Sequence, residues 1–346
     1  MYKEKTTKGF GDIAITNKGN SEFLIKVKEL IEWEKLNKIL QSKLKRNKNA
    51  AGNPPYSELL LFKILLLETW FNLSDEKVEE AINDRISFIK FLELSLESST
   101  PDHSTISRFR NSLIKSDLDK ELFCEINRQL ETKGILVKSG IIVDATIVSS
   151  SRRPKKIIEV AEEDRKESDT EASKEKQESH KVVYSKDVDA GWIKKRNQYY
   201  YGHKVHNAVT PTGFIVGGIL TPANKSDINN FENVMNELPV LNENIPVLAD
   251  KGYASATNRE YLLKRTLSDK IMHKAVKGKP LTEEQKEENR EISKYRYVVE
   301  QTFGLLKLHF GFDRMRYIGN RKCSLEYRIK SMAFNLEKAC YSFWWG

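Results

Sequence analysis

Three acidic residues in this chain have the surroundings expected of metal ligands. Asp144 lies within the apolar segment IIVDATIV, and Asp250 ends a second apolar segment, PVLAD. A buried carboxylate is costly unless a cation or hydrogen bonds balance its charge, and hard divalent cations take oxygen ligands. Either aspartate alone is more often a turn former or a helix N-cap, whereas the two together favour a cation site.

Glu300 is the third candidate ligand, in the segment KYRYVVEQTFGLLKLHF. If this segment is a helix, Arg296 and Lys307 lie within about 40° of Glu300 on one face of it. The charged stripe is either a surface ladder of ion pairs or the lining of a site. The strongly apolar remainder of the segment, which includes Val299 and Phe303, favours a lining.

Phosphodiester chemistry with two metal ions requires this combination of side chains. Two Mg²⁺ (or Mn²⁺) ions about 4 Å apart activate the attacking oxygen and stabilise the leaving oxygen. Three carboxylates suffice because Mg²⁺ keeps water ligands and takes substrate phosphates. We therefore predict that Asp144, Asp250 and Glu300 bind the metal ions. Arg296 and Lys307 are predicted to neutralise charge on phosphate oxygens during catalysis.

Buried strands and a long helix must position these residues. Segments rich in β-branched residues at 140–148 and 245–250 predict the two strands that carry the aspartates. A hairpin is predicted around residues 210–213, from strands at 199–208 and 213–220. Helices are predicted at 227–238, 282–308 and 324–345. The pattern predicts a mixed α/β catalytic domain over residues 133–346.

The preceding part of the chain has helical periodicity throughout. We predict a helix over residues 21–48, a break at 52–55 and several short helices from 56 to about 130. Ser74 is a predicted N-cap, as is either Asp102 or Ser104. Residues 1–132 are therefore expected to form a helical domain with a basic N-terminal segment.

One helix of this domain resembles the recognition helix of a helix-turn-helix motif. Its polar side chains are predicted to meet DNA phosphates and base edges. The same segment also has the spacing of an ordinary core helix, through Ile106, Phe109 and Leu113. The predicted DNA contacts are Ser104, Ser107, Arg108, Arg110 and Asn111.

The charge balance favours a polyanionic partner. The net charge is +9, with twelve Lys or Arg against six Asp or Glu in residues 1–50 and seven against two in residues 301–330. Two separated basic zones fit a DNA footprint better than a uniformly solvated surface. Residues 152–190 are dense in both signs of charge and predict a solvated, partly disordered insertion.

The cysteines, the N-terminus and the most apolar run of the chain indicate the cellular compartment of the protein. The three cysteines are scattered and odd in number, so we expect neither a disulfide framework nor a zinc site. The N-terminus has no apolar signal core, and the most apolar run, residues 59–73, contains Lys63 and Glu68. We therefore expect a soluble, cytoplasmic protein with no membrane partner, and an amphipathic or buried helix over that run.

His203, Lys204 and His206 lie on the predicted strand at 199–208. Because successive side chains of a strand point to opposite faces, His203 faces away from both Lys204 and His206. His203 is either a sheet histidine hydrogen-bonded locally or a catalytic residue.

Most of the chain resembles the insertion-sequence DDE transposases, in particular family five, which is related to family four. The segment from PPYSELLLF to SRFRNSL is similar to the helical N-terminal domain of that family. GIIVDATIV, VLADKGY and RYVVEQTFGLLKLHFGFDRMRY resemble its three catalytic segments, and YYYGHKVHNAV and TPANKSDIN resemble the strand and turn after the first. The signature Tyr-x2-Arg-x3-Glu-x6-Lys maps onto Arg296, Glu300 and Lys307, but Ser293 stands at the tyrosine position.

The resemblance implies a ribonuclease H-like fold for about residues 135–320, with Asp144, Asp250 and Glu300 as the metal-binding triad. It implies cleavage of the ends of an insertion element and joining of the 3′-hydroxyl ends to target DNA. The partners would be double-stranded DNA, as terminal inverted repeats and as target, and a second copy of the chain in a dimer or larger assembly. The alternatives are a nuclease of the same fold without strand transfer, and an inactive or domesticated copy that only binds DNA.

Overall fold

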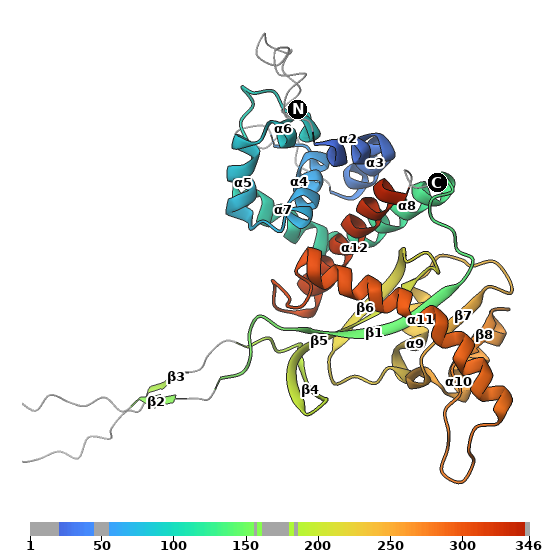
Figure 1. The fold of residues 1–346 in the computed structure, drawn as a ribbon. Coiled ribbons are helices and arrows are strands. Elements are labelled where there is room, and N and C mark those ends of the chain that lie inside the picture. Colours follow the sequence, from blue (N-terminus) through green and yellow to red (C-terminus); the bar gives the residue numbers. More distant parts are fainter. Residues whose placement is uncertain (1–20, 45–54, 156–157, 161–179, 183–185, 343–346) are drawn as a thin grey trace, which may run out of the picture.

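The structure is a computed structural model in which a bundle of helices lies against a mixed sheet (Figure 1). It describes residues 21–44, 55–155, 158–160, 180–182 and 186–342. The prediction of an all-helical part followed by a mixed α/β part is confirmed.

The helical part is built around α4 (Glu58–Trp70). Every side chain of α4 from Leu61 to Glu68 is buried, so this leucine-rich run forms a core helix. The surrounding helices are α2 (Glu22–Leu30), α3 (Trp33–Lys43), α5 (Asp75–Asp84), α6 (Ile86–Leu92), α7 (His103–Ser116) and α8 (Leu118–Thr132). Ser74 accepts a hydrogen bond from the Lys77 amide and Asp102 accepts one from the Thr105 amide, which confirms both N-caps.

The single helix predicted over residues 21–48 is wrong, because α2 ends at Leu30 and α3 begins at Trp33. Ile31 adopts an extended backbone conformation. In one continuous helix the side chains of Ile31 and Trp33 would point about 160° apart. The interruption allows both to be buried, with 4% and 8% of their surface exposed. The end of the predicted helix and most of the break at 52–55 lie outside the described residues.

The main sheet has the strand order β4-β5-β1-β7-β8, and β6 pairs with the same edge of β5 as β4 does. β1 pairs antiparallel with β5 and parallel with β7, which in turn pairs parallel with β8. The predicted strands and hairpin are confirmed as β1 (Ile141–Ser149), β5 (Gln198–Val209), β6 (Ile215–Pro222) and β7 (Pro246–Ala249). The sheet also contains β4 (Gly191–Lys195) and β8 (Ser268–Ile271).

Helices on the sheet complete the mixed part of the chain. The predicted helix at 227–238 is a 3-10 turn, η1 (Ile228–Asn230), followed by α9 (Phe231–Asn236). α10 (Ala256–Lys264), β4 and β8 were not predicted. The helix that carries Glu300 is α11 (Glu283–Phe310), and it begins with a capping box formed by Thr282 and Gln285.

The last helix, α12 (Asn320–Ser342), joins the two parts of the structure (Figure 1). The Trp70 indole of α4 donates a hydrogen bond to the Ala333 carbonyl, with 3.0 Å between donor and acceptor. On the other side, the Asn335 amide both donates to and accepts from the backbone of Ile215 in β6, at 2.7 and 2.9 Å. The helix therefore packs against the helical bundle as well as the sheet.

Much of the predicted insertion at 152–190 lies outside the described residues. Two short strands within it, β2 (Ile158–Val160) and β3 (His180–Val182), pair antiparallel. Asp187, near its end, is buried, so that end of the insertion is packed and not solvated as predicted. None of the helices in the described residues is both long and apolar enough to cross a membrane.

Candidate active site

The two candidate aspartates lie side by side because β1 and β7 pair in parallel. The register places Val143 beside Ala249, and Asp144 and Asp250 are the next residue of each chain segment. β7 ends at Ala249 whereas β1 continues to Ser149, so the pairing stops at the two aspartates. Neighbouring strands are about 4.8 Å apart, which brings the two side chains within reach of one ligand.

The helix α11 packs against β1 and brings Glu300 to the same place. One amino group of the Arg296 guanidinium lies 3.3 Å from Asp144 Oδ2, 3.7 Å from Asp250 Oδ2 and 3.4 Å from Glu300 Oε1. The three predicted ligands therefore converge on one cationic group. Glu300 is the most open of them, with 63% of its side chain exposed against 16% for Asp144.

Arg296 and the three carboxylates around it form the acidic cluster, whose surroundings change the pKa of Asp144 and of Arg296. Burial raises the pKa of Asp144, although the Ala145 amide and the Arg296 guanidinium oppose this effect. For Arg296, burial favours loss of the proton, but the charges of Asp144 and Asp250 outweigh it and raise the pKa. The guanidinium is thus the positive charge that balances the three carboxylates in this structure.

Lys307 lies beside β1 without contacting the three acids. Its ammonium donates a hydrogen bond to Thr146 Oγ1 at 2.8 Å. Thr146 is two residues after Asp144 and so projects from the same face of β1. Burial lowers the pKa of Lys307, as does the nearby charge of Lys195, while Asp313 opposes them. Arg296, Glu300 and Lys307 thus follow β1 along one face of α11.

Ser293 stands one helical turn before Arg296, and its hydroxyl donates a hydrogen bond to the Asn289 carbonyl at 2.8 Å. Tyr295 and Tyr297, the neighbouring aromatic residues, have 49% and 63% of their surface exposed. Both phenols therefore lie at the surface of α11.

His203 and His206 are both buried and point to opposite faces of the sheet, as predicted. His206 is hydrogen-bonded to the Tyr253 hydroxyl and to Thr221 Oγ1, at 3.1 and 3.2 Å. Burial lowers the pKa of His206 to about 4, so its imidazole is neutral at neutral pH. Burial also raises the pKa of Tyr253, which keeps the phenol protonated beside the acidic cluster.

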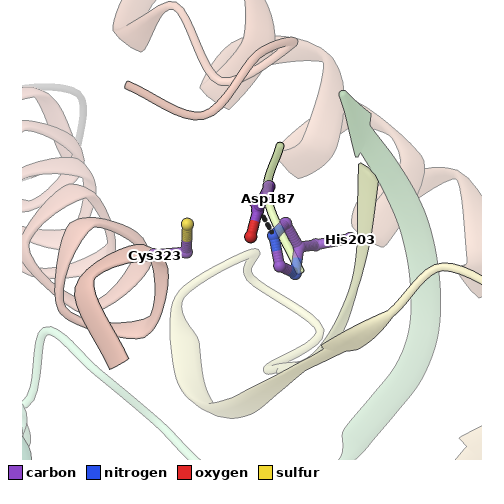
Figure 2. Close-up of side chains that lie close together, drawn as sticks. All are labelled: Asp187, His203 and Cys323. Atoms are coloured by element: carbon purple, nitrogen blue, oxygen red, sulfur yellow. Dashed lines mark hydrogen bonds and ion pairs between the residues drawn. The ribbon is translucent and has the colours of Figure 1, made fainter. Parts of the chain in front are cut away.

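His203 forms part of a second buried group with Asp187 and Cys323, shown in Figure 2. The His203 Nε2 atom lies 2.9 Å from Asp187 Oδ2, and the possible ligand atoms of the three residues lie within 4.8 Å of one another. Asp187 also accepts hydrogen bonds from the Ser150 hydroxyl and the Gly319 amide. Cys323 donates to the Tyr317 carbonyl.

These contacts fit the interpretation of His203 as a locally bonded histidine, in a junction between the sheet and α12. The spacing of the cysteines could not reveal the group, because its members come from three distant segments.

The candidate DNA contacts on α7 differ in exposure. Arg108 and Asn111 are exposed and Ser104 and Ser107 are half-buried. Arg110 is buried, and its guanidinium pairs with Asp75 at 2.7 Å and with Glu68 at 2.9 Å. The prediction of Arg110 as a DNA contact is therefore wrong, because its charge is already paired with two carboxylates inside the protein.

The buried position of Arg110 predicts a stability effect. Arg110→Ala should lower the free energy of unfolding by about 3 kcal/mol, because it leaves Asp75 without its ion-pair partner and the buried Glu68 with only the Arg316 guanidinium, at 3.4 Å. Burial already raises the pKa of Glu68 to about 7, against the opposing charge of Arg110. The folded state therefore binds more protons than the unfolded state, so the loss should be larger at pH 8 than at pH 5.

Urea unfolding at the two pH values measures this effect, with Arg108→Ala as the matched control. The control should unfold like the wild type. An Arg110→Ala protein as stable as the control would show that the buried pairing contributes nothing.

Comparison with known proteins identifies the family. The chain matches the family model described as the transposase DDE domain over residues 136–336, and a second transposase domain (DUF772) over residues 13–112. It is 40% identical over 235 residues to the transposase for insertion sequence element IS1106 of Neisseria meningitidis serogroup B. That match covers 67% of this chain and 76% of the relative. The chain belongs to the DDE transposase family.

Solved transposase structures are more distant. The piggyBac transposase synaptic complex with hairpin DNA is 11% identical, with a TM-score of 0.44, over 95% of this chain and 76% of that one. The Mos1 strand transfer complex is 9% identical, with a TM-score of 0.22, over 77% of this chain and 84% of that one.

Family membership makes the chain a DNA transposase and a DDE-type polynucleotidyl transferase, which confirms the predicted class of enzyme. The mixed sheet with its helices lies within the residues that match the transposase DDE domain. DDE transposases generally use divalent metal ions. The assignment to family five of the insertion-sequence transposases, inferred from the sequence, stays a prediction.

Proposed function

We propose that this transposase cuts the ends of its insertion element and joins the 3′-hydroxyl ends to target DNA, using Asp144, Asp250 and Glu300 as metal ligands. The observation that carries the proposal is the convergence of these three carboxylates on the Arg296 guanidinium. An ordinary fold gains nothing from bringing carboxylates of two strand segments and one helix together around a single positive charge, because burying charged groups is costly.

The donor set fits two Mg²⁺ or Mn²⁺ ions. All three side chains offer hard oxygen ligands. The Asp250 Oδ1 atom is buried and has no hydrogen-bond partner in the part of the chain that the structure describes, so it could coordinate a cation. Bound ions would activate the attacking oxygen and stabilise the leaving oxygen.

The chain's own cations would act on the phosphate. Arg296 lies among the carboxylates and Lys307 lies beside Thr146, so both are close to the place where a scissile phosphate would approach. Positive groups held in position reduce the charge that develops on phosphate oxygens in the transition state. The hydrogen bond to Thr146 keeps the Lys307 ammonium directed along β1.

DNA recognition is assigned to the helical part. We propose that residues 1–132 form the DNA-binding and dimerisation domain and residues 133–346 the catalytic domain. Exposed Arg108 and Asn111, with Ser104 and Ser107, would contact the terminal inverted repeats. Because two element ends must be joined, we propose that the active form is a dimer or larger assembly on double-stranded DNA.

Two reactions test the proposal. The protein is incubated with Mg²⁺ and a duplex that carries the inverted repeat flanking the gene, and separately with pre-cut ends and a target plasmid. We expect cleavage in the first reaction and joined products in the second. Cleavage without joining would indicate a nuclease of the same fold, and binding without either reaction an inactive DNA-binding copy.

A further inference from the structure

A groove with a volume of about 770 Å³ lies at the end of β1. Its walls are residues 149–153 with Lys155 on one side, and Asp313 and Arg314 on the other. Neither segment contributes to the acidic cluster. The groove therefore has no role in the mechanism described so far.

The floor of the groove is a hydrogen-bonded backbone. The Ser149 amide donates to the Asp313 carbonyl at 2.9 Å, and the Met315 amide donates to the Ser149 carbonyl at 2.8 Å. The Arg314 guanidinium donates to the Ser151 carbonyl at 3.0 Å. The segment after α11 thus extends the sheet beside β1 and fixes the two walls relative to each other.

The buried pair of Asp187 and His203 positions the first wall (Figure 2). Asp187 accepts a hydrogen bond from the Ser150 hydroxyl at 2.8 Å, and its own amide donates to the Arg152 carbonyl at 3.2 Å. His203 Nε2 lies 2.9 Å from the same oxygen of Asp187, Oδ2, that accepts from Ser150. The backbone that carries Arg152 and Arg153 is therefore held from inside the protein.

The groove presents an excess of positive charge to solvent. It contains four cationic side chains and one acidic side chain, and Arg152, Arg153 and Arg314 are exposed. Within the described part of the chain, no carboxylate forms an ion pair with any of these three arginines. Arginines held on an ordered backbone without acidic partners are suited to binding phosphate oxygens.

The groove lies at the end of β1, farther along the strand than the catalytic residues. Asp144 is followed by Thr146, which holds Lys307, and then by Ser149 at the groove. Five residues of a strand span about 16 Å. Phosphates of one DNA strand follow one another at about 3.4 Å along the helix axis, so this span corresponds to about five base pairs.

We infer that the groove binds the sugar–phosphate backbone of the DNA about five base pairs from the phosphate that is cut. This inference rests on the proposed function, because the distance is counted from the proposed catalytic carboxylates. Arg152, Arg153 and Arg314 are the contact residues, and Asp187 and His203 are positioning residues for them.

The double variant Arg152→Ala/Arg153→Ala tests this inference in a DNA-binding assay with EDTA. Affinity for the terminal-repeat duplex should fall by at least about tenfold at 150 mM salt. The slope of log Kd against log salt concentration should become shallower by about one to two, since each lost phosphate contact removes about 0.9 from it. The control, Lys264→Ala/Lys270→Ala, removes the same charge from α10 and β8 and should bind like the wild type.

The position of the contact is tested with duplexes that carry one neutral methylphosphonate linkage. Neutralising the phosphate about five base pairs from the cut should weaken wild-type binding more than it weakens binding of the double variant, which keeps only Arg314 among the three contact residues. Equal sensitivity of both proteins at every position, or an unchanged salt slope, would overturn the inference.

Both measurements are made without metal, so their outcome does not depend on catalysis. A protein that showed the groove effect but cut no DNA would contradict the proposed reaction and not the groove.

Discussion

Replacing Asp250 with alanine is expected to slow metal-dependent cleavage of DNA ends by at least about 10³-fold. The same loss is expected for Asp144→Ala and Glu300→Ala, because each change removes one of the three carboxylates that meet at Arg296. Single-turnover cleavage of a labelled terminal-repeat duplex measures the rate of the chemical step. A saturating enzyme concentration separates this rate from DNA affinity.

The three variants should keep their fold and their DNA binding. The Asp250 Oδ1 atom accepts no hydrogen bond from any residue that the structure describes. Removing this atom in Asp250→Ala therefore deprives no donor of its acceptor. Removing a negative charge beside the DNA should also tighten binding slightly when no metal is present. Near-wild-type cleavage in any one variant would remove that residue from the proposed triad.

The places of the acidic residues in the fold could be predicted because two similar strand patterns and one helical pattern occur together, although each aspartate alone is ambiguous. An aspartate within or at the end of an apolar strand is costly unless something balances it, and both strands are buried as expected. The helical period then fixes Arg296, Glu300 and Lys307 on one face of α11. The structure adds that β1 and β7 pair in parallel register, a long-range fact that no local pattern contains.

The features that could not be predicted depend on partners far away in the chain. Arg110 lies four residues after Ile106 and three before Leu113, on the buried face of α7, but its charge favoured an exposed position. The acids that pair with it lie 35 and 42 residues away. β4 and β8 lie at the edges of the sheet and are short and largely polar, so they lack the apolar pattern of a strand. Asp187 sits beside a charge-dense stretch, and only its contact with His203 reveals that it is buried.

The place of Arg296 at the centre of the acids was not predicted either, and it has a consequence for metal affinity. The guanidinium balances the charge that a metal ion would otherwise balance, so the two cations compete for the same three carboxylates. At an effective dielectric constant of about 20, two unit charges 4 Å apart interact by about 4 kcal/mol. Even a fraction of this repulsion would weaken metal binding measurably.

Arg296→Met is therefore expected to tighten Mn²⁺ binding by about tenfold or more and to slow cleavage by about 10²-fold. The first effect follows from removing the competing charge, and the second from removing a positive group that would face the phosphate. Titration calorimetry measures the affinity and single-turnover cleavage measures the rate. Arg296→Lys keeps the charge and should not tighten Mn²⁺ binding. Weaker Mn²⁺ binding in Arg296→Met would show instead that the arginine holds the carboxylates in place for the metal, and unchanged cleavage would exclude it from the chemistry.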